Sequence, residues 1–116
     1  MAEHRQVTVT PDRYVTYRYA GASGDFNPIH LDDEFARSVG LPSKILHGLW
    51  TMAQVARVQS EDPLALQSLS VQFRGMGVPE REITITSTPR ADGTIDCEAV
   101  QDGNRLVRRG RAALKL

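Results

Sequence analysis

The chain has 116 residues, of which 41% are hydrophobic and 24% are charged. We expect one domain spanning residues 1–116, because two halves would each be too small to build a core. Fourteen basic and fourteen acidic side chains give a formal net charge of zero. A nucleic-acid partner is therefore not expected, since duplex binders normally carry a basic excess.

No apolar run approaches the roughly 20 residues that cross a bilayer, and no apolar segment of a secretory signal follows the first residues. We therefore expect no membrane partner and a cytoplasmic location. The single cysteine, Cys97, excludes an internal disulfide and a zinc site built from cysteines. Its place on the apolar side of an alternating run predicts a small buried hydrophobe.

The first elements are predicted to be a strand and a helix. Residues 5–10 favour a strand, because apolar and polar residues alternate there. Thr10 is predicted to cap a helix whose first residue is Pro11 and whose last turn ends near residue 22.

An irregular loop and a short helix are predicted next. Pro28 lacks a backbone donor and disfavours helical geometry at Asn27, so a fixed loop is expected. Asp32 is predicted to cap the short helix, which ends at Gly40.

A third helix is predicted over residues 47–60. Its apolar residues extend most of the way round the helix, and such a helix is normally buried on all sides. These residues are Leu49, Trp50, Met52, Ala53, Val55, Ala56 and Val58. We therefore expect the rest of the chain to wrap this helix.

From about residue 67 the hydrophobic pattern changes to a period of two, which is typical of half-buried strands. Asp92-Gly93 and Asp102-Gly103 are predicted hairpin turns, and a last strand is predicted over residues 105–116. We expect these strands to pair in chain order as an antiparallel meander curled round the helix, which makes an α+β domain.

Asp25 and His30 are the first candidates for chemistry, because the loop fixed by Pro28 can direct a carboxylate and an imidazole toward one point. A metal site is not expected, since a catalytic zinc needs three protein ligands and no third is evident. A serine triad is not expected either, because the sequence lacks a Gly-x-Ser-x-Gly motif. An acid–base pair that needs no cofactor remains. The plainer alternative is that Asp25 makes an Asx turn and His30 satisfies backbone groups.

Two strings carry a resemblance to a known family. Residues 23–30 read Ser-Gly-Asp-Phe-Asn-Pro-Ile-His, and residues 45–48 read Ile-Leu-His-Gly. Together they resemble the MaoC-like hydratases and dehydratases of the hot-dog fold, which include (R)-specific enoyl-CoA hydratases and the B-type dehydratase subunits of mycolate synthesis. The resemblance implies a hot-dog domain. It also implies a lyase that reversibly hydrates a trans-2-enoyl thioester, on coenzyme A or a carrier protein, to the (R)-3-hydroxyacyl thioester.

The resemblance also implies roles for four residues. Asp25 and His30 fall on the catalytic dyad, and Asn27 falls on an asparagine expected to hold the loop. Gly48 falls on the glycine whose backbone N–H receives the thioester oxygen. A first helical turn suits that role, because its amide donors lack internal partners. The alternative for Gly48 is a packing role. The neighbouring His47 also falls on a position of the family pattern, and we expect its role to be structural.

The C-terminal region is basic, with no acidic residue after Asp102. Its basic residues are Arg105, Arg108, Arg109, Arg111 and Lys115. The plain interpretation is a solvated strand face. The alternative is a site for the phosphates of coenzyme A or of a carrier-protein phosphopantetheine.

The chain departs from the family pattern at two places. Residues 75–81 replace the usual Pro-Gly-Asp turn, and Ala56 stands where some (R)-hydratases carry a serine. The expected partner is a second hot-dog subunit, in a homodimer or a heterodimer, because one layer leaves a sheet edge and a helix flank exposed. A non-catalytic or partner-dependent subunit is the main alternative to an active hydratase. A hot-dog acyl-CoA thioesterase is less favoured.

Overall fold

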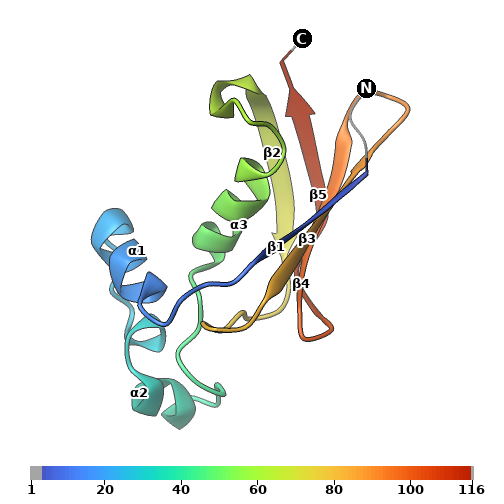
Figure 1. The fold of residues 1–116 in the computed structure, drawn as a ribbon. Helices are drawn as coiled ribbons and strands as arrows, with labels where there is room; N and C mark the ends of the chain where they lie inside the picture. The colour runs from blue at the N-terminus through green and yellow to red at the C-terminus, as the bar shows by residue number, and fades with distance from the viewer. Residues whose placement is uncertain (1–3, 116) are drawn as a thin grey trace.

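A five-stranded antiparallel sheet carries the longest helix against one of its faces (Figure 1). The computed structural model describes residues 4–115. The strands are β1 (Arg5–Val9), β2 (Leu66–Phe73), β3 (Ile83–Pro89), β4 (Ile95–Gln101) and β5 (Asn104–Leu114). The helices are α1 (Val15–Ser23), α2 (Asp33–Ser38) and α3 (Gly48–Arg57), with short 3₁₀ helices at Pro28–His30 and Pro63–Ala65. The predicted α+β class is confirmed.

The strand order is β1-β3-β4-β5-β2. The predicted meander is therefore right for β3, β4 and β5 and wrong for β2, which pairs with β5. The segment between β2 and β3, residues 74–82, has no two-residue turn signal, and it passes the ends of the central strands instead of closing a hairpin. As a result β1 and β2 are the two edges of the sheet.

Both predicted Asp-Gly turns are confirmed. Gly93 has a φ of 88°, and Asp102 and Gly103 have φ angles of 51° and 79°. Positive φ at two successive central residues is the geometry of a type I′ turn, whose twist matches that of the flanking strands. The β4–β5 hairpin therefore closes as the local sequence dictates.

Helix α1 starts later than predicted. The Oδ1 atom of Asp12 accepts a hydrogen bond from the backbone N–H of Tyr14 (2.7 Å), and the first helical residue is Val15. This Asx turn competes with helix formation, so the predicted start at Thr10 and Pro11 is wrong. None of the described helices is both long and apolar enough to cross a membrane.

Helix α2 begins as predicted. The Oδ1 atom of Asp32 accepts hydrogen bonds from the backbone N–H groups of Glu34 (2.9 Å) and Phe35 (3.2 Å), so two of the free donors at the helix start are satisfied. Figure 1 shows α1 and α2 together beyond one end of the sheet.

Helix α3 is buried on one face only, so the prediction of a helix wrapped on all sides is wrong for this chain. Val55 and Thr51 lie on the buried face of this helix, whereas Leu49 is 59% exposed and Ala53 is exposed. The sheet is a single layer and can cover only one side of the helix. The other side leaves apolar residues without a partner in the described chain.

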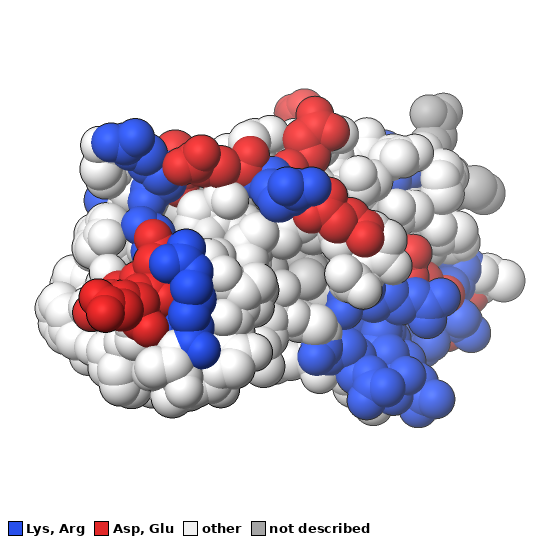
Figure 2. All heavy atoms as spheres, turned by 90° about the horizontal axis from the view of Figure 1, so that it is seen from below, with Lys and Arg blue, Asp and Glu red and all other residues white. Residues whose placement is uncertain are grey.

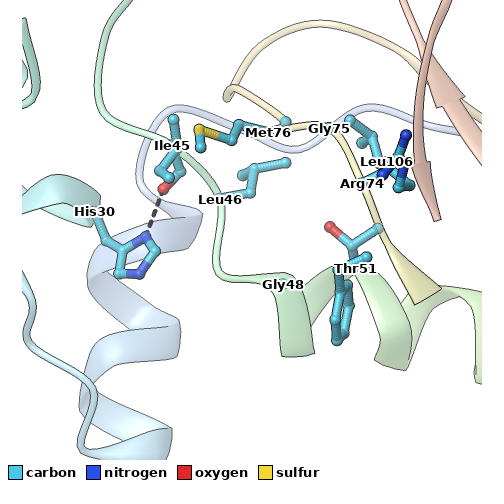
Figure 3. Close-up of a pocket in the computed structure, with 11 residues that line it drawn as sticks. His30, Ile45, Leu46, Gly48, Thr51, Arg74, Gly75, Met76 and Leu106 are labelled. Carbon is cyan, nitrogen blue, oxygen red and sulfur yellow. Dashed lines mark hydrogen bonds between the residues drawn. The ribbon is translucent and has the colours of Figure 1, made fainter. Parts of the chain in front are cut away.

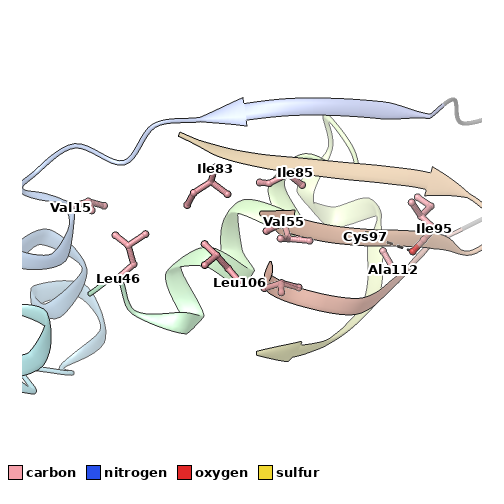
Figure 4. Close-up of a cluster of buried hydrophobic side chains, with 11 residues drawn as sticks. Val15, Leu46, Val55, Ile83, Ile85, Ile95, Cys97, Leu106 and Ala112 are labelled. Atoms are coloured by element: carbon pink, nitrogen blue, oxygen red, sulfur yellow. Dashed lines mark hydrogen bonds between the residues drawn. The ribbon is translucent and has the colours of Figure 1, made fainter. Parts of the chain in front are cut away.

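The core lies between α3 and the concave face of the sheet (Figure 4). Ile83, Ile85, Val55 and Val107 are fully buried at its centre. Cys97 lies among them, as predicted, and burial raises the pKa of its thiol from 9.0 to about 11. This core fixes α3 on the sheet, and the N-terminus of α3 points toward the loop between α1 and α2 (Figure 1).

Candidate functional site

The loop that carries Asp25 is held by a chain of hydrogen bonds from side chains to the backbone. Ser23 Oγ accepts from the Asp25 N–H, Asp25 Oδ1 accepts from the Asn27 N–H, and Asn27 Oδ1 accepts from the Ile29 N–H, each at 3.2 Å. Pro28 opens the 3₁₀ helix that ends at His30. Each polar side chain thus fixes the residue two positions later, and the loop has one defined path.

His30 is buried, and one contact determines which of its two ring nitrogens donates a hydrogen bond. The side chain is 9% exposed, and Nδ1 lies 2.9 Å from the backbone carbonyl oxygen of Ile45 (Figure 3). A carbonyl oxygen only accepts, so Nδ1 is the donor. In the neutral ring Nε2 therefore carries a lone pair and can receive a proton.

The structure brings Asp25 and His30 together. Asp25 Oδ2 lies 3.7 Å from His30 Nε2, which is longer than a hydrogen bond. The Asp25 side chain is 54% exposed, so it faces solvent while the imidazole is buried behind it. Two acceptors that face each other without a direct hydrogen bond are arranged to share a third group that donates to both.

His47 connects this loop to α3. It is the N-cap residue of α3 and is buried, and its ring stacks on the ring of His30 with centroids 3.8 Å apart and planes inclined by 20°. Its Nε2 lies 3.0 Å from the backbone oxygen of Asp25 and is therefore the donor. Its Nδ1 has no hydrogen-bond partner among residues 4–115. The contacts of His47 are thus to both members of the Asp25–His30 pair.

The sequence-based argument against a metal rested on a missing third ligand, and that premise is wrong. Asp25, His30 and His47 offer ligand atoms that all lie within 4.8 Å of one another. The arrangement nevertheless suits a metal poorly, because imidazole lone pairs lie in the ring planes and two stacked rings cannot both direct them at one ion. Two of the four ring nitrogens are also engaged by backbone carbonyls.

A cavity of about 250 Å³ lies beside this pair (Figure 3). The lining residues come from the stretch between α1 and α3, from α3 itself, from the end of β2 with the segment that follows it, and from β5. They are His30, Ile45, Leu46, Gly48, Thr51, Phe73, Arg74, Gly75, Met76, Gly77 and Leu106. The cavity thus brings His30 and Gly48 onto one surface. Asp25 does not line it, but its Oδ2 atom lies 3.7 Å from Nε2 of His30, which does.

Gly48 is the first residue of α3, where a backbone N–H has no partner within the helix. The side chain of His47, the N-cap residue, makes no cap hydrogen bond. A Cβ added at Gly48 would lie 3.3 Å from the ring of Phe73. The glycine therefore lets an oxygen atom approach the helix N-terminus from the cavity side.

Sequence reasoning missed several cavity residues. Thr51 is 4% exposed, and Figure 3 shows its hydroxyl pointing into the cavity. It lies one turn after Gly48 and is the polar residue on the buried face of α3, a signal that could have found it. Arg74 and Met76 belong to the segment after β2, whose path depends on the strand order and could not be predicted locally.

Sequence reasoning also missed Gln101, which lies outside the cavity lining. It is buried, and its side-chain amide exchanges hydrogen bonds with the backbone of Val78 (2.8 and 2.9 Å) and donates to the carbonyl of Arg81 (3.0 Å). Those three bonds fix the segment that follows the cavity-lining glycines. The cavity wall is therefore anchored to β4 by one side chain.

Comparison with known proteins gives a family match over most of the chain. Residues 2–108 match a family model described as a MaoC like domain. The peroxisomal enoyl-CoA hydratase 2 of Arabidopsis thaliana is 41% identical over 68 residues, which are 54% of this chain and 21% of that protein. The enoyl-CoA hydratase ChsH3 of Mycobacterium tuberculosis is 32% identical over 104 residues, covering 85% of this chain and 31% of that protein. The chain thus spans about a fifth to a third of the length of these two relatives.

Solved structures share the fold at low sequence identity. The (R)-hydratase from A. caviae superposes with a TM-score of 0.81 at 22% identity, covering 98% of this chain and 94% of that one. A chain of the ChsH1–ChsH2 complex from Mycobacterium tuberculosis superposes with a TM-score of 0.81 at 18% identity, covering 97% and 93%. The predicted hot-dog fold is confirmed.

Proposed function

Since the chain belongs to the MaoC-like dehydratase family, we propose that it is a lyase that hydrates a trans-2-enoyl thioester reversibly to the (R)-3-hydroxyacyl thioester. The observation that carries the proposal is the pair of Asp25 Oδ2 and His30 Nε2, 3.7 Å apart beside a cavity that also exposes Gly48. Two of the relatives of this chain are enoyl-CoA hydratases, which supports this activity.

In the hydration direction, one water molecule donates to both Asp25 and His30. The carboxylate and the Nε2 lone pair are both acceptors, so the two hydrogens of the water can satisfy them. When the water oxygen attacks the β-carbon, one of these groups takes a proton from the water. That same proton is then passed to the α-carbon, and the second hydrogen of the water stays on the new hydroxyl. In dehydration the same groups remove the α-proton and protonate the leaving hydroxyl.

The negative charge that develops on the thioester oxygen needs a fixed donor. The N–H of Gly48 at the N-terminus of α3 supplies one, and the helix dipole favours negative charge there. A single oxyanion donor is worth about 10²–10³ in rate. Gly48 therefore contributes to the chemical step as much as proton transfer does.

A partner subunit belongs to the proposal. The outer side of α3 exposes Leu49 and Ala53, and within residues 4–115 β2 pairs only with β5. A second hot-dog subunit would cover this flank, as a second copy or as a different chain. The ChsH1–ChsH2 complex is an example of two different subunits in one assembly. Light scattering of the purified chain, alone and after co-purification, distinguishes the two arrangements.

The first experiment is hydration of crotonyl-CoA by the purified protein, followed by loss of enoyl-thioester absorbance with chiral analysis of the product. We expect (R)-3-hydroxybutyryl-CoA, and a loss of about 10³-fold or more in Asp25→Asn and in His30→Ala, because each removes a proton-transfer group. Asp12→Asn, at a carboxylate outside the cavity, is the matched control. Near-normal turnover by a folded Asp25→Asn variant would overturn the dyad.

A further inference from the structure

Thr51 lies on the buried face of α3 with a hydroxyl that is free to bind a ligand. The residue is 4% exposed, and Figure 3 shows its hydroxyl pointing into the cavity that Gly48 also lines. A threonine in a helix can donate to the carbonyl four residues back, which here belongs to His47. That carbonyl already accepts from the backbone N–H groups of Trp50 (3.1 Å) and Thr51 (3.3 Å), and the Thr51 hydroxyl makes no hydrogen bond within residues 4–115.

Thr51 and Gly48 share one face of α3. Thr51 follows Gly48 by three positions, which places the two residues on the same side of the helix, one turn apart. A helical side chain also leans toward the N-terminus and covers the turn before its own Cα. The Thr51 side chain therefore leans over the turn that begins at Gly48, where no side chain competes for the space. A ligand oxygen that accepts from the Gly48 N–H lies on the side of the helix that Thr51 covers.

The cavity offers few other side chains that donate hydrogen bonds. Among its lining residues in the described chain, only His30, Thr51 and Arg74 carry such groups. His30 belongs to the candidate dyad, and its Nδ1 already donates to the carbonyl of Ile45. Arg74 is exposed, so water screens its charge. Thr51 is therefore the buried side-chain donor of this cavity that has no other task.

The charge around the cavity has the sign that suits a developing oxyanion. Arg74 lines the cavity and is the main cause of a lowered pKa at Arg108, so the two guanidinium groups are near neighbours. Figure 2 shows basic side chains gathered in one area of the face seen from below, with few acidic ones beside them. A positive potential of this kind favours negative charge nearby, and a buried donor at fixed geometry adds the directional contact.

We propose that the Thr51 hydroxyl is the second hydrogen-bond donor to the thioester oxygen, beside the N–H of Gly48. The inference rests on the proposed function and adds a catalytic residue to it. A carbonyl oxygen has two lone pairs and accepts from two donors, and it accepts more strongly as negative charge develops on it. The hydroxyl keeps its proton throughout the reaction, and no bond to Thr51 forms or breaks.

Thr51→Val is the decisive variant, because valine has nearly the shape of threonine and the same β-branched stem but no hydroxyl. We expect kcat for crotonyl-CoA to fall about 10²–10³-fold with little change in KM, since the lost contact is stronger in the transition state than in the ground state. Thr51→Ser keeps the hydroxyl and should lose less than about tenfold. Thr8→Val, at an exposed threonine of β1, is the matched control and should change neither kcat nor KM.

The order of the two Thr51 variants separates a donor from a packing residue. A packing role predicts the reverse order, with an active Thr51→Val and an impaired Thr51→Ser, because only serine lacks the buried methyl group. Thermal unfolding checks that both variants fold, and Thr51→Val should be at least as stable as the wild type because it removes a buried hydroxyl that has no partner. A folded Thr51→Val with normal kcat, or equal losses in the two variants, would overturn the proposal.

A vibrational measurement tests the contact without turnover. Raman difference spectra of crotonyl-CoA bound to Asp25→Asn should show the thioester carbonyl band at a lower frequency than in solution, because the donors polarise the carbonyl. Adding Thr51→Val to this variant should reverse part of the shift, and adding Thr51→Ser should not. A band that stays in place when the hydroxyl is removed would overturn the contact.

The kinetic and vibrational measurements separate this contact from the proposed activity. If the wild type does not hydrate crotonyl-CoA but the carbonyl band depends on Thr51, the contact stands and the activity does not. If hydration proceeds and neither kcat nor the band depends on Thr51, the activity stands and the contact is overturned. If none of the proteins shows the band of a bound thioester, the cavity does not hold one and both are overturned.

Discussion

The imidazole rings of His30 and His47 are stacked with their centroids 3.8 Å apart, and the two rings come from elements 17 positions apart in the chain. His47 also donates to the backbone oxygen of Asp25. One buried side chain therefore positions both members of the candidate dyad, although it does not line the cavity.

Replacing His47 by phenylalanine keeps a flat ring for the stack and removes the donor to Asp25. We expect kcat to fall about 10- to 100-fold with little change in KM, because the carboxylate loses its fixed position but the thioester cavity is intact. His47→Gln, which keeps an N–H donor, should recover part of kcat. His4→Phe, at an exposed histidine bound to Thr88, is the control. A rise in KM with unchanged kcat would contradict a positioning role.

Substituting Gly48 by valine separates the oxyanion role from a packing role. The added side chain meets the Phe73 ring and also occupies the approach to the Gly48 N–H, so we expect a loss of about 10²–10³ in kcat/KM. Phe73→Ala makes room for the valine but does not clear the approach. Recovery of activity in the double variant would therefore indicate that Gly48 is only a packing glycine.

Gln101→Ala should destabilise the protein and loosen the cavity wall. The substitution leaves the N–H of Val78 and the carbonyls of Val78 and Arg81 without their side-chain partner. An unsatisfied buried polar group costs about 1–3 kcal/mol, so we expect a fall of that size in the free energy of unfolding by urea, together with a higher KM. Gln67→Ala, at an exposed glutamine of β2, should change neither quantity.

Two glycine-to-alanine substitutions should change stability in opposite directions. A Cβ at Gly110 would lie 2.6 Å from the backbone oxygen of Cys97, so β4 and β5 must move apart, at a cost of about 1–3 kcal/mol. A Cβ at Gly21 in α1 meets nothing within 4 Å, so alanine there should stabilise the helix by about 0.5–1 kcal/mol. Thermal unfolding of both variants checks the prediction, and equal effects would contradict it.

Cys97 predicts a loss of stability at alkaline pH. Burial raises the pKa of the thiol from 9.0 to about 11, so the folded state favours the neutral thiol. The stabilisation is complete below pH 9 and is lost as pH rises toward 11, by about 2–3 kcal/mol at most. The free energy of unfolding of the wild type should therefore fall more steeply over this range than that of Cys97→Ala. Parallel curves for the two proteins would contradict the prediction.

The parts of the structure that depend on neighbouring residues could be predicted from the sequence. The loop around Asp25 follows from Asn27 and Pro28, which act on the residues beside them, and the β4–β5 turn follows from Asp102 and Gly103. The start of α1 was wrong even though it is local, because the Asx turn at Asp12 competed with the cap signal at Thr10.

The parts that depend on distant residues could not be predicted. The pairing of β2 with β5 depends on sheet closure, and so does the place of Arg74. The stack of His47 on His30 depends on how α3 docks, which no spacing shows. Apolar residues do lie most of the way round α3, but burying all of them needs more than one covering surface. The described part of this chain supplies only one.

Both ends of the described chain lie at the end of the sheet opposite α1 and α2 (Figure 1). The loop of Asp25 and His30 and the N-terminus of α3 are therefore remote from the points where more polypeptide could be attached. A second unit can be fused through either terminus with a short tether and without rearranging the residues that carry the chemistry. Such a fold can serve equally well as one module of a long multifunctional polypeptide or as an independent subunit, and engineered tandem fusions of this chain should retain its site.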